Sequence, residues 1–340
     1  MNLNWNDPVV VITGASSGIG KASARLFAEH GARLVLAARR KNLLNDLVDE
    51  LEDLGTEAIA VEADVSEKDK VQDVAKQAIK RFGRIDVWVN NAGVGAVGRF
   101  DEIPLNEHDQ LIRTNLMGVI YGSSAALKHF RKRRKGVLIN VASVEGKQAF
   151  AYHASYAASK HAIVGLDSAL RQELELNREK NIYVSTVMPS AINTPFFRHA
   201  ANHTGKKVVA PPPVYAPEQV AETIVKLARS PEDEAYVGGA GRLFGAQSRV
   251  ARKFADRQAG RLHQKHQIEE AQEGEDSSGS LFEPMEEGVE AKDEWTESGR
   301  IVDPVAIALG AIIPAVAGIW FWKQRSIRNR EREYEMSDVA

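Results

Sequence analysis

A tyrosine and a lysine four residues apart, Tyr156 and Lys160, have the residue types and spacing that suit acid–base chemistry. Side chains four positions apart on a helix lie on one face. A free phenol has a pKa of about 10, too high for a base at neutral pH, but a nearby ammonium group stabilises the phenolate and lowers that pKa. The pair therefore predicts a general acid/base, although among seven tyrosines such a spacing can also arise by chance.

Two more polar residues fit the same chemistry. Ser143 ends the apolar run 136–143, a predicted strand, and the loops after parallel strands carry ligand-facing groups. Its hydroxyl could hold a substrate carbonyl oxygen near Tyr156, or it could only cap a local turn. Asn115 lies within the helical pattern 111–127, where asparagine is unfavourable. It is therefore either exposed at the surface or holds a catalytic water.

A glycine-rich turn over 13–20 predicts a dinucleotide site. It follows the apolar run 9–12 and precedes a helical pattern over 21–28, and free N–H groups at a helix N-terminus attract anions. Gly14 would allow the tight turn, Gly18 the approach of a pyrophosphate, and Gly20 the close packing of helix on strand. An ordinary turn between strand and helix is the alternative.

The end of the second predicted strand, 33–38, indicates which cofactor is bound. An acidic residue there would hold the ribose 2′-hydroxyl of NAD, whereas an arginine favours the 2′-phosphate of NADP. Ala38 occupies the acidic position and Arg39 follows it, which predicts NADP(H). The alternative is a solvated basic cluster, but cations are disfavoured at the start of a helix.

The remaining patterns alternate between strand and helix and predict an α/β fold, a Rossmann-type doubly wound parallel sheet in a single domain over 1–245. Ser66 is predicted to cap the third helix. The further predicted strands are 58–61, 85–89, 136–143, 182–188 and 235–237, and the further helices are 42–54, 71–82, 111–127, 156–176 and 220–228.

Together these motifs resemble the short-chain dehydrogenases/reductases. The resemblance runs from about Val9 to Tyr236 and rests on the turn Thr13–Gly20, Asp64, the Asn90-Asn91-Ala92-Gly93 run, Asn115, Ser143 and Tyr156-x-x-x-Lys160. It implies hydride exchange between a nicotinamide and a carbonyl or alcohol carbon. By the same resemblance, Tyr156 is the general acid/base and Ser143 orients the substrate oxygen. Lys160 lowers the tyrosine pKa and holds the nicotinamide ribose, and Asn115 positions a water.

The resemblance also implies the cofactor contacts. Asp64 and Val65 would contact adenine, and Thr194 would reach the nicotinamide carboxamide. The other residues that it implies at the cofactor are Thr13, Gly14, Ser16, Ser17, Gly18, Ile19, Gly20, Arg39, Asn91, Ala92, Gly93, Tyr156 and Lys160. One departure is Pro189-Ser190, where the family often has Pro-Gly.

Two alternatives stay open. The extended epimerases and dehydratases carry a Gly-x-x-Gly-x-x-Gly turn, which differs from the turn of this chain. A non-catalytic NADP-binding membrane-tethered sensor or scaffold would not need competent residues at all four catalytic positions. The loop 191–214 is fairly apolar, which indicates a lipophilic ketone or aldehyde, although packing alone also calls for apolar residues. The family resemblance further implies a homodimer or homotetramer packed through the helices of Asn115 and Tyr156.

Composition narrows the functional class. A net charge of −2 gives no support for nucleic-acid binding. The chain has no cysteine, so disulfides and thiolate metal sites are excluded, and no metal site is expected. The N-terminal stretch 1–8 lacks the pattern of a signal peptide.

The C-terminal part divides by composition into a basic helix over 246–268, an acidic disordered linker over 269–303, an uncharged stretch over 304–322 and a basic tail over 323–340. As a helix, the uncharged stretch would be about 28 Å long, close to the hydrocarbon thickness of a bilayer. It ends with Trp320 and Trp322, which suit the interface, and predicts a single transmembrane anchor. The basic tail favours the cytoplasmic side, but without an export signal we expect the enzyme domain itself to be cytoplasmic.

Overall fold

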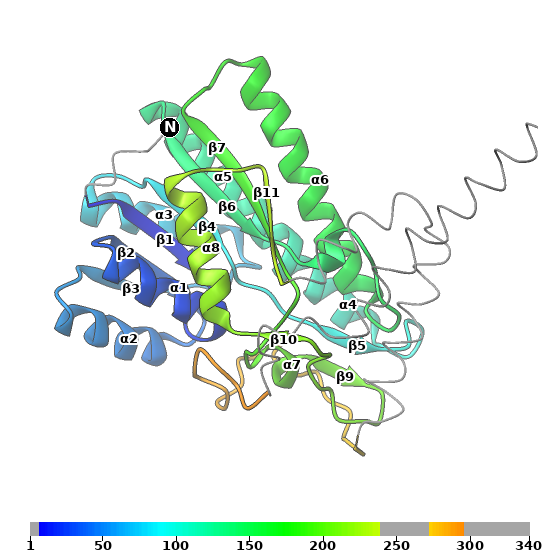
Figure 1. Cartoon of the computed structure of the whole chain (residues 1–340). Helices are drawn as coiled ribbons and strands as arrows, with labels where there is room; N and C mark the ends of the chain where they lie inside the picture. The colour runs from blue at the N-terminus through cyan, green and yellow to red at the C-terminus, as the bar shows by residue number, and fades with distance from the viewer. Residues whose placement is uncertain (1–6, 239–271, 296–340) are drawn as a thin grey trace, which may run out of the picture. The chain divides into compact units, whose positions relative to one another are not determined.

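Seven parallel strands form the central sheet of this protein (Figure 1). The computed structural model describes residues 7–238 and 272–295. The strand order is β11-β7-β6-β4-β1-β2-β3. These strands are β1 (Val9–Thr13), β2 (Arg33–Ala38), β3 (Ala58–Glu62), β4 (Val87–Asn90), β6 (Gly136–Val141), β7 (Ile182–Pro189) and β11 (Glu234–Val237). The order runs outward from β1 to β3 and then resumes at β4 on the other side of β1. A crevice forms at such a reversal, outside the carboxyl ends of the strands.

Helices cover both faces of the sheet, because alternate residues of each strand point to opposite sides. Val10 and Ile12 of β1 belong to the core beneath α1 (Gly18–Glu29), α2 (Lys41–Asp53) and α8 (Pro217–Arg229). Val9 and Val11 belong to the core beneath α3 (Lys68–Phe82), α5 (Gly118–Arg133) and α6 (Ala154–Leu176). The predicted doubly wound α/β fold is confirmed.

The helix predicted over 111–127 belongs to a longer helical stretch. α4 (Leu105–Ile112) continues through a π-helical turn, η1 (Arg113–Met117), into α5. The loop-rich region after β7 contains the short elements β8 (Ala191–Ile192), α7 (Phe196–His199), β9 (Ala201–His203) and β10 (Val214–Tyr215). Strand β5 (Ala96–Gly98) pairs with β9, and β8 pairs with β10, both in parallel. Such short strands lack the alternation that would predict them from sequence.

The start of α3 differs from the expectation. Ser66 does not cap this helix: its backbone N–H instead donates to Oδ1 of Asp64 at 2.8 Å, and the helix begins after Glu67. The carboxylate of Asp64 is the stronger acceptor of the two side chains, so it closes the local turn.

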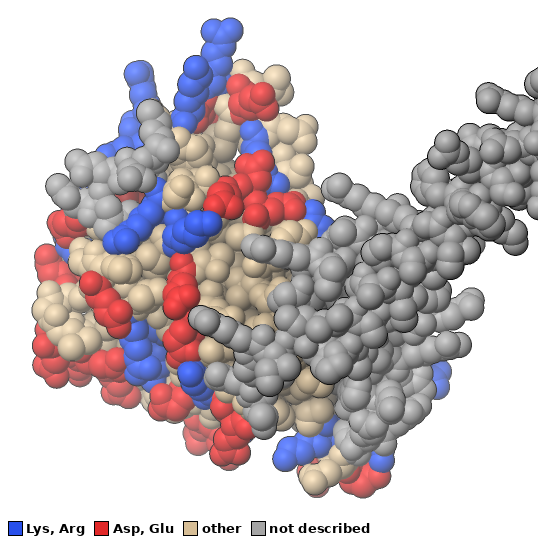
Figure 2. Space-filling model, in the orientation of Figure 1, with Lys and Arg blue, Asp and Glu red and all other residues tan. Residues whose placement is uncertain are grey.

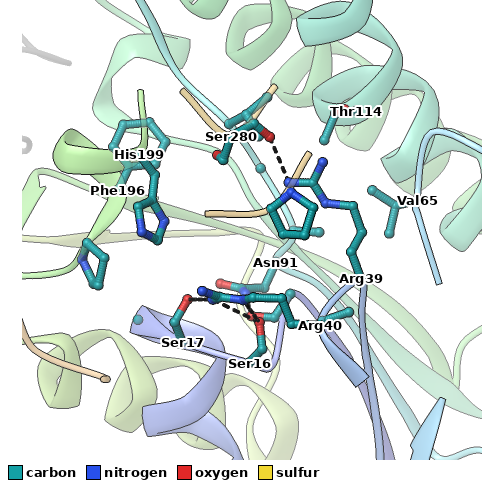
Figure 3. Close-up of a pocket in the computed structure, with 18 of the residues that line it drawn as sticks. Ser16, Ser17, Arg39, Arg40, Val65, Asn91, Thr114, Phe196, His199 and Ser280 are labelled. Carbon is teal, nitrogen blue, oxygen red and sulfur yellow. Dashed lines mark hydrogen bonds between the residues drawn. The ribbon is translucent and has the colours of Figure 1, made fainter. Parts of the chain in front are cut away.

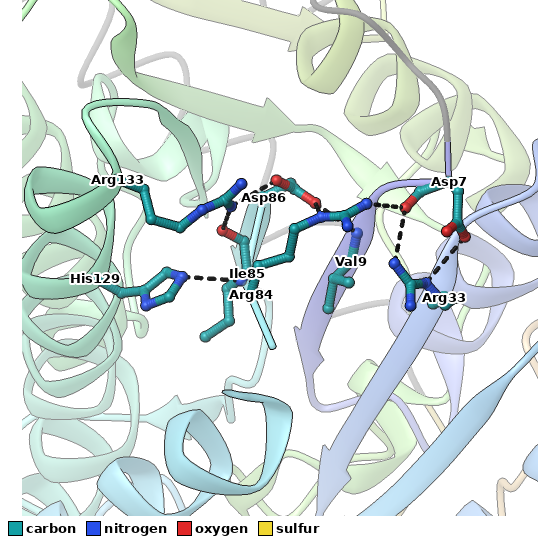
Figure 4. A network of polar contacts seen from close by, with 8 residues as sticks. All are labelled: Asp7, Val9, Arg33, Arg84, Ile85, Asp86, His129 and Arg133. Carbon is teal, nitrogen blue, oxygen red and sulfur yellow. Dashed lines mark hydrogen bonds and ion pairs between the residues drawn. The ribbon is translucent and has the colours of Figure 1, made fainter. Parts of the chain in front are cut away.

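A polar network ties the amino ends of β1 and β4 to α5 (Figure 4). Oδ2 of Asp86 accepts hydrogen bonds from the Val9 N–H at 2.9 Å and from Arg84 at 2.8 Å, and Oδ1 accepts one from Arg133 at 2.7 Å. Burial alone would raise the pKa of Asp86, but these hydrogen bonds together hold it below its ordinary value. This end of the sheet is therefore closed by structural contacts, and the carboxyl end is left for ligands.

Residues 272–295 fall within the stretch that composition predicts to be disordered, but the structure places them against the domain. Acidic residues there meet basic partners of the domain, for example Glu290 with Lys21 and Asp293 with Arg198. Composition alone does not reveal these partners. Acidic and basic side chains are interspersed over the face of the domain seen in Figure 2.

Within residues 7–238 and 272–295, no helix is long and apolar enough to cross a membrane. The predicted basic helix 246–268, transmembrane segment 304–322 and basic tail 323–340 all lie outside the described residues.

Candidate active site

A cleft of about 190 Å³ opens at the carboxyl ends of β1, β2, β3 and β4, where the sheet order reverses (Figure 3). It brings together most of the residues predicted to bind the cofactor. Those that line it are Gly14, Ser16, Ser17, Gly18, Ile19, Arg39, Asp64, Val65, Asn91, Ala92, Gly93 and Thr194. Thr13 and Gly20 lie behind this lining and shape it.

The glycine turn is packed too closely for side chains. A Cβ on Gly20 would lie 2.2 Å from the carbonyl oxygen of Gly14, and one on Gly14 would lie 2.8 Å from Cα of Ala92. Gly14 also has φ +65° and Gly18 has φ +56°, which favour glycine. The backbone of the turn is thus left bare at the start of α1, as a bound pyrophosphate requires.

Thr13 and Asn91 fix the glycine turn to the end of β4. Oγ1 of Thr13 accepts hydrogen bonds from the backbone N–H groups of Asn91 at 3.0 Å and Ala92 at 3.2 Å. Nδ2 of Asn91 donates to the carbonyls of Thr13 at 2.9 Å and Gly14 at 3.2 Å. The two side chains therefore position the turn at the switch point of the sheet.

Two arginines, Arg39 and Arg40, occupy the end of the cleft beyond β2. Nη2 of Arg40 donates to the hydroxyls of Ser16 at 3.1 Å and Ser17 at 2.9 Å (Figure 3). Burial lowers the pKa of Arg40, and the positive charge of the adjacent Arg39 lowers it further, because two guanidinium groups lie together at this end. Sequence reasoning singled out Arg39 and missed Arg40. The two serines of the glycine turn, which accept hydrogen bonds from Arg40, were the sequence feature that could have indicated its role.

Tyr156 and Lys160 share a face of α6 beside the cleft. Nζ of Lys160 lies 5.5 Å from the ring centroid of Tyr156 and donates to the carbonyl of Val141 at 3.0 Å. A Cβ on Gly93, which lines the cleft, would lie 3.7 Å from this Nζ and 3.4 Å from Oδ1 of Asn115. The backbone of Gly93 therefore lines the cleft on one side and faces Lys160 and Asn115 on the other.

The pKa values of the pair differ from the expectation that Lys160 lowers the tyrosine pKa. Burial raises the pKa of Tyr156, the negative charge of Glu145 raises it further, and only a hydrogen bond with Ser143 lowers it. Burial lowers the pKa of Lys160 to about 8. The phenol of Tyr156 is therefore protonated at neutral pH, and both burial and the nearby carboxylate oppose its ionisation.

Ser143 caps a local turn, which is one of the two roles considered for it, and it also meets Tyr156. It hydrogen-bonds with Tyr156, and its Oγ also accepts the backbone N–H of Glu145 at 3.1 Å, capping the short 3₁₀ helix η2 (Val144–Gly146). The cap holds the hydroxyl in place, since a serine bound to a local N–H has little rotational freedom.

Asn115 is buried rather than exposed, in the π-helical turn η1. Its Oδ1 accepts the N–H of Val94 at 2.8 Å, and its Nδ2 donates to the Val94 carbonyl at 2.9 Å and to Ser159 at 3.3 Å. The side chain therefore holds the loop after Gly93 against α6. π-Turns within α-helices occur often at functional sites.

Glu145 and His153 are buried near Tyr156, and sequence reasoning missed both. Oε1 of Glu145 lies 2.9 Å from Nδ1 of His153, and the His153 ring meets the Tyr156 ring edge-on with centroids 6.2 Å apart. A glutamate two residues after Ser143 and a histidine three before Tyr156 were the only sequence signals.

The loop 191–214 packs much of its apolar surface on itself. Phe197, Val208 and Val214 are buried in one cluster with Val97. Phe196 instead faces Tyr156, with ring centroids 5.5 Å apart. The departure at Ser190 is tolerated, because among the described residues positive φ outside glycine occurs only at Asp7, Arg134, Tyr152 and Arg178.

Comparisons with known proteins agree with this geometry. The family model for short chain dehydrogenase matches residues 8–205. An uncharacterized oxidoreductase, YxnA of Bacillus subtilis, is 38% identical over 253 residues, which cover 74% of this chain and 71% of that protein. The 3-oxoacyl-[acyl-carrier-protein] reductase FabG of Thermotoga maritima is 33% identical over 234 residues, covering 68% of this chain and 93% of that protein.

Solved structures show the same fold. A short chain dehydrogenase/reductase from Burkholderia phymatum in complex with NAD has a TM-score of 0.67 and 27% identity, covering 75% of this chain and 97% of that one. An alcohol dehydrogenase from Thermococcus sibiricus complexed with 5-hydroxy-NADP has a TM-score of 0.60 and 28% identity, covering 68% and 96%. This protein therefore belongs to the short-chain dehydrogenases/reductases, oxidoreductases that act on carbonyl or alcohol groups.

Proposed function

We propose that this protein is an NADP(H)-dependent carbonyl reductase in which Tyr156 is the general acid. The observation that carries the proposal is the meeting of Tyr156, Ser143 and Lys160 beside a cleft whose far end holds Arg39 and Arg40. The bare glycine backbone at the start of α1 fits a dinucleotide pyrophosphate. Bound NADPH would supply the hydride.

The protein's own residues would handle the substrate oxygen. The Ser143 hydroxyl, held by its cap, would donate a hydrogen bond to the carbonyl oxygen. Tyr156 would then give its phenol proton to that oxygen as negative charge develops there. The phenol is protonated at neutral pH, which is the form from which it can donate. Lys160, held by the Val141 carbonyl, would bind the nicotinamide ribose.

The preference for NADP(H) over NAD(H) rests on the arginines. Arg40 is fixed by two serine hydroxyls at the place where a 2′-phosphate would lie, and Ala38 leaves no carboxylate to bind a 2′-hydroxyl. An arginine presents paired donors that match phosphate oxygens. The Thermococcus sibiricus relative was solved with an NADP derivative, whereas the Burkholderia phymatum relative was solved with NAD.

The substrate we propose is a lipophilic ketone or aldehyde. Phe196 packs beside Tyr156, so a substrate carbonyl at the tyrosine would have an apolar ring next to it. Most other apolar residues of the loop are used in packing, and Phe196 is therefore the main support for this substrate class.

We also propose that residues 304–322 form a single C-terminal membrane anchor and that the enzyme domain lies in the cytoplasm. The uncharged stretch with its two tryptophans supports the anchor. We further propose, from the family resemblance, a homodimer or homotetramer that packs through the helices of Asn115 and Tyr156. Protease protection of intact cells tests the topology: digestion of the enzyme domain by an external protease would refute it. Light scattering of the purified protein tests the oligomer.

The test of the proposed activity is NADPH oxidation by the full-length protein in detergent, with a panel of lipophilic ketones, aldehydes and quinones at high NADPH concentration. We expect turnover, and a loss of about 10²- to 10⁴-fold in Tyr156→Phe with NADPH binding retained. NADPH binding without turnover of any panel member would favour the non-catalytic, membrane-tethered NADP-binding protein instead. Absence of nucleotide binding would refute both.

A further inference from the structure

The acidic segment 272–295 follows the edge of the cofactor cleft, shown in orange in Figure 1. It first bridges to β9 and the loop after it, where Ser277 pairs with Asn202 and Glu273 with Lys206. Ser280, Pro284 and Met285 then form part of the cleft lining itself. At the far end, Nε1 of Trp295 donates to the carbonyl of Thr194 at 3.2 Å. A stretch more than two hundred residues after the glycine turn and the two arginines thus becomes one wall of the site.

The acidic segment contacts the domain through a buried side chain and a close backbone approach. Leu281 is 0% exposed and packs in a cluster with Val94, Leu111 and Ala201. Gly288 has φ +65°, and a Cβ there would lie 2.5 Å from Nε2 of His199. The segment therefore fits the domain through a buried leucine and, seven residues later, a tight glycine contact.

Backbone carbonyls of the acidic segment occupy the donors of both arginines. Nη2 of Arg39 donates to the carbonyl of Ser280 at 2.7 Å (Figure 3). Nη1 of the same side chain donates to the carbonyl of Phe282 at 3.0 Å. Nη1 of Arg40 donates to the carbonyl of Met285 at 3.0 Å. These are the donors that a 2′-phosphate would need.

The helix N-terminus is occupied in the same way. The backbone N–H of Gly18 donates to the carbonyl of Glu290 at 3.0 Å. Nζ of Lys21, one turn into α1, lies 3.3 Å from Oε2 of Glu290 and 3.4 Å from the Val289 carbonyl. A carbonyl and a carboxylate therefore meet the positive end of the helix, where a pyrophosphate would bind.

We propose that the acidic segment 272–295 is an intramolecular competitor of the dinucleotide, and that the cofactor binds only when the segment leaves the cleft. The inference rests on the proposed function of this cleft as the NADP(H) site. With the segment in place the cleft measures about 190 Å³, whereas pockets for drug-sized ligands measure about 300–1,000 Å³. The phosphate-binding donors and the space for the nucleotide are taken by the same segment.

Competition of this kind weakens the apparent affinity for cofactor by the fraction of molecules in which the segment is released. A variant that releases the segment should therefore bind NADPH more tightly. Removing the buried Leu281 side chain shifts the equilibrium by its burial energy, which corresponds to at least about tenfold. The affinity for NADH should rise similarly, since the segment also covers the Gly18 N–H.

The test is isothermal titration of NADPH into the full-length protein and three variants. Leu281→Ser removes the buried anchor, and Phe282→Ser makes a matched change at the neighbouring side chain, which is 40% exposed. Gly288→Val acts at a separate contact and clashes with His199 without touching the apolar cluster. Hydrogen exchange of the 272–295 amides, with and without NADPH, reports release of the segment directly.

We expect Leu281→Ser and Gly288→Val to lower the NADPH dissociation constant about tenfold or more, Phe282→Ser to leave it near the wild-type value, and NADPH to speed exchange over 272–295. Weaker binding in both release variants would show that the segment clasps the bound cofactor, and would overturn the proposal. Equal affinities and unchanged exchange would overturn it while leaving the proposed function intact. If no form bound either nucleotide, the proposed function itself would fail.

Discussion

Oε1 of Glu145 lies 2.9 Å from Nδ1 of His153, and this buried pair adjoins Tyr156. Burial is the larger cause of the pKa shift in both catalytic candidates. The carboxylate charge further raises the pKa of the tyrosine and offsets part of the lowering at Lys160. A negative charge near a phenol opposes its ionisation, so Glu145 favours the protonated acid that carbonyl reduction requires. Glu145 therefore adds to burial, the larger cause, in opposing the ionisation of Tyr156.

Glu145→Gln should therefore lower the pKa of Tyr156. The proposed mechanism needs the protonated phenol and the Lys160 ammonium, so the loss of kcat at high pH should move to lower pH in this variant. The pKa of Lys160 should also fall below its value of about 8, because the carboxylate no longer stabilises the ammonium. A pH profile of NADPH-dependent turnover measures the shift.

A matched control is Glu234→Gln, which removes a carboxylate paired with Lys147 rather than one next to Tyr156. Its pH profile should overlay that of the wild type. A Glu145→Gln profile that also overlays the wild type would show that the carboxylate does not govern the tyrosine.

The buried ammonium of Lys160 should lower the free energy of unfolding. Its pKa of about 8, against 10.5 for a free lysine, corresponds to about 3 kcal/mol. Below pH 8 the native state must hold a buried ammonium, so the cost is complete there. Between pH 8 and 10.5 the native state releases the proton before the unfolded state does, and stability rises with pH.

Lys160→Met should consequently raise the free energy of unfolding by about 1–3 kcal/mol at pH 7, although it abolishes turnover. The gain should shrink as the pH approaches 10.5. Urea unfolding at several pH values measures it. A destabilised Lys160→Met would mean that the hydrogen bond to the Val141 carbonyl outweighs the cost of the buried charge.

Arg40 should contribute to cofactor choice as much as Arg39 does. Substituting either arginine with glutamine removes a charged donor from the 2′-phosphate, and such hydrogen bonds contribute about 1.5–3 kcal/mol. The preference for NADPH over NADH, measured as a ratio of kcat/KM values, should fall about 10- to 100-fold in each variant. The acidic segment also contacts both arginines, but its influence largely cancels in this ratio. A preference unchanged in both variants would contradict the assignment of NADP(H).

Asn115→Ala should destabilise the protein by about 2–4 kcal/mol, because the N–H and C=O of Val94 are buried and would both lose their partner. Asn177→Ala is the control. Its side chain bonds only the Glu173 carbonyl at the exposed end of α6, so we expect a loss below about 1 kcal/mol. Thermal unfolding compares the two, and equal losses would refute the structural role of Asn115.

Residues near one another in sequence made the fold and much of the candidate site predictable. The run Val9–Ile12 followed by the glycine turn and an amphipathic helix is a local signal, and its repetition predicts a parallel sheet. The spacing of Tyr156 and Lys160 needs only a helix to bring them together. Ala38 and Arg39 lie at a strand end, which the sheet topology places at the cleft.

Contacts between distant residues could not be predicted in this way. The role of Asn115 depends on Val94, whose loop it meets only through the turn from α4 into α5. The pKa of Tyr156 rises chiefly through burial, which has no sequence pattern of its own, and further through the charge of Glu145.

The acidic segment 272–295 shows the same limit most clearly. Composition predicts disorder there, because few of its residues are apolar. Its order comes from Leu281 in a cavity of the domain and from carbonyls facing Arg39 and Arg40, 241 to 245 positions away in sequence. Sequence determined that the chain carries a dinucleotide fold with a tyrosine and a lysine one helical turn apart. Only the tertiary structure decided which groups surround that tyrosine and which segment covers the cleft, because burial and long-range complementarity exist only in the folded chain.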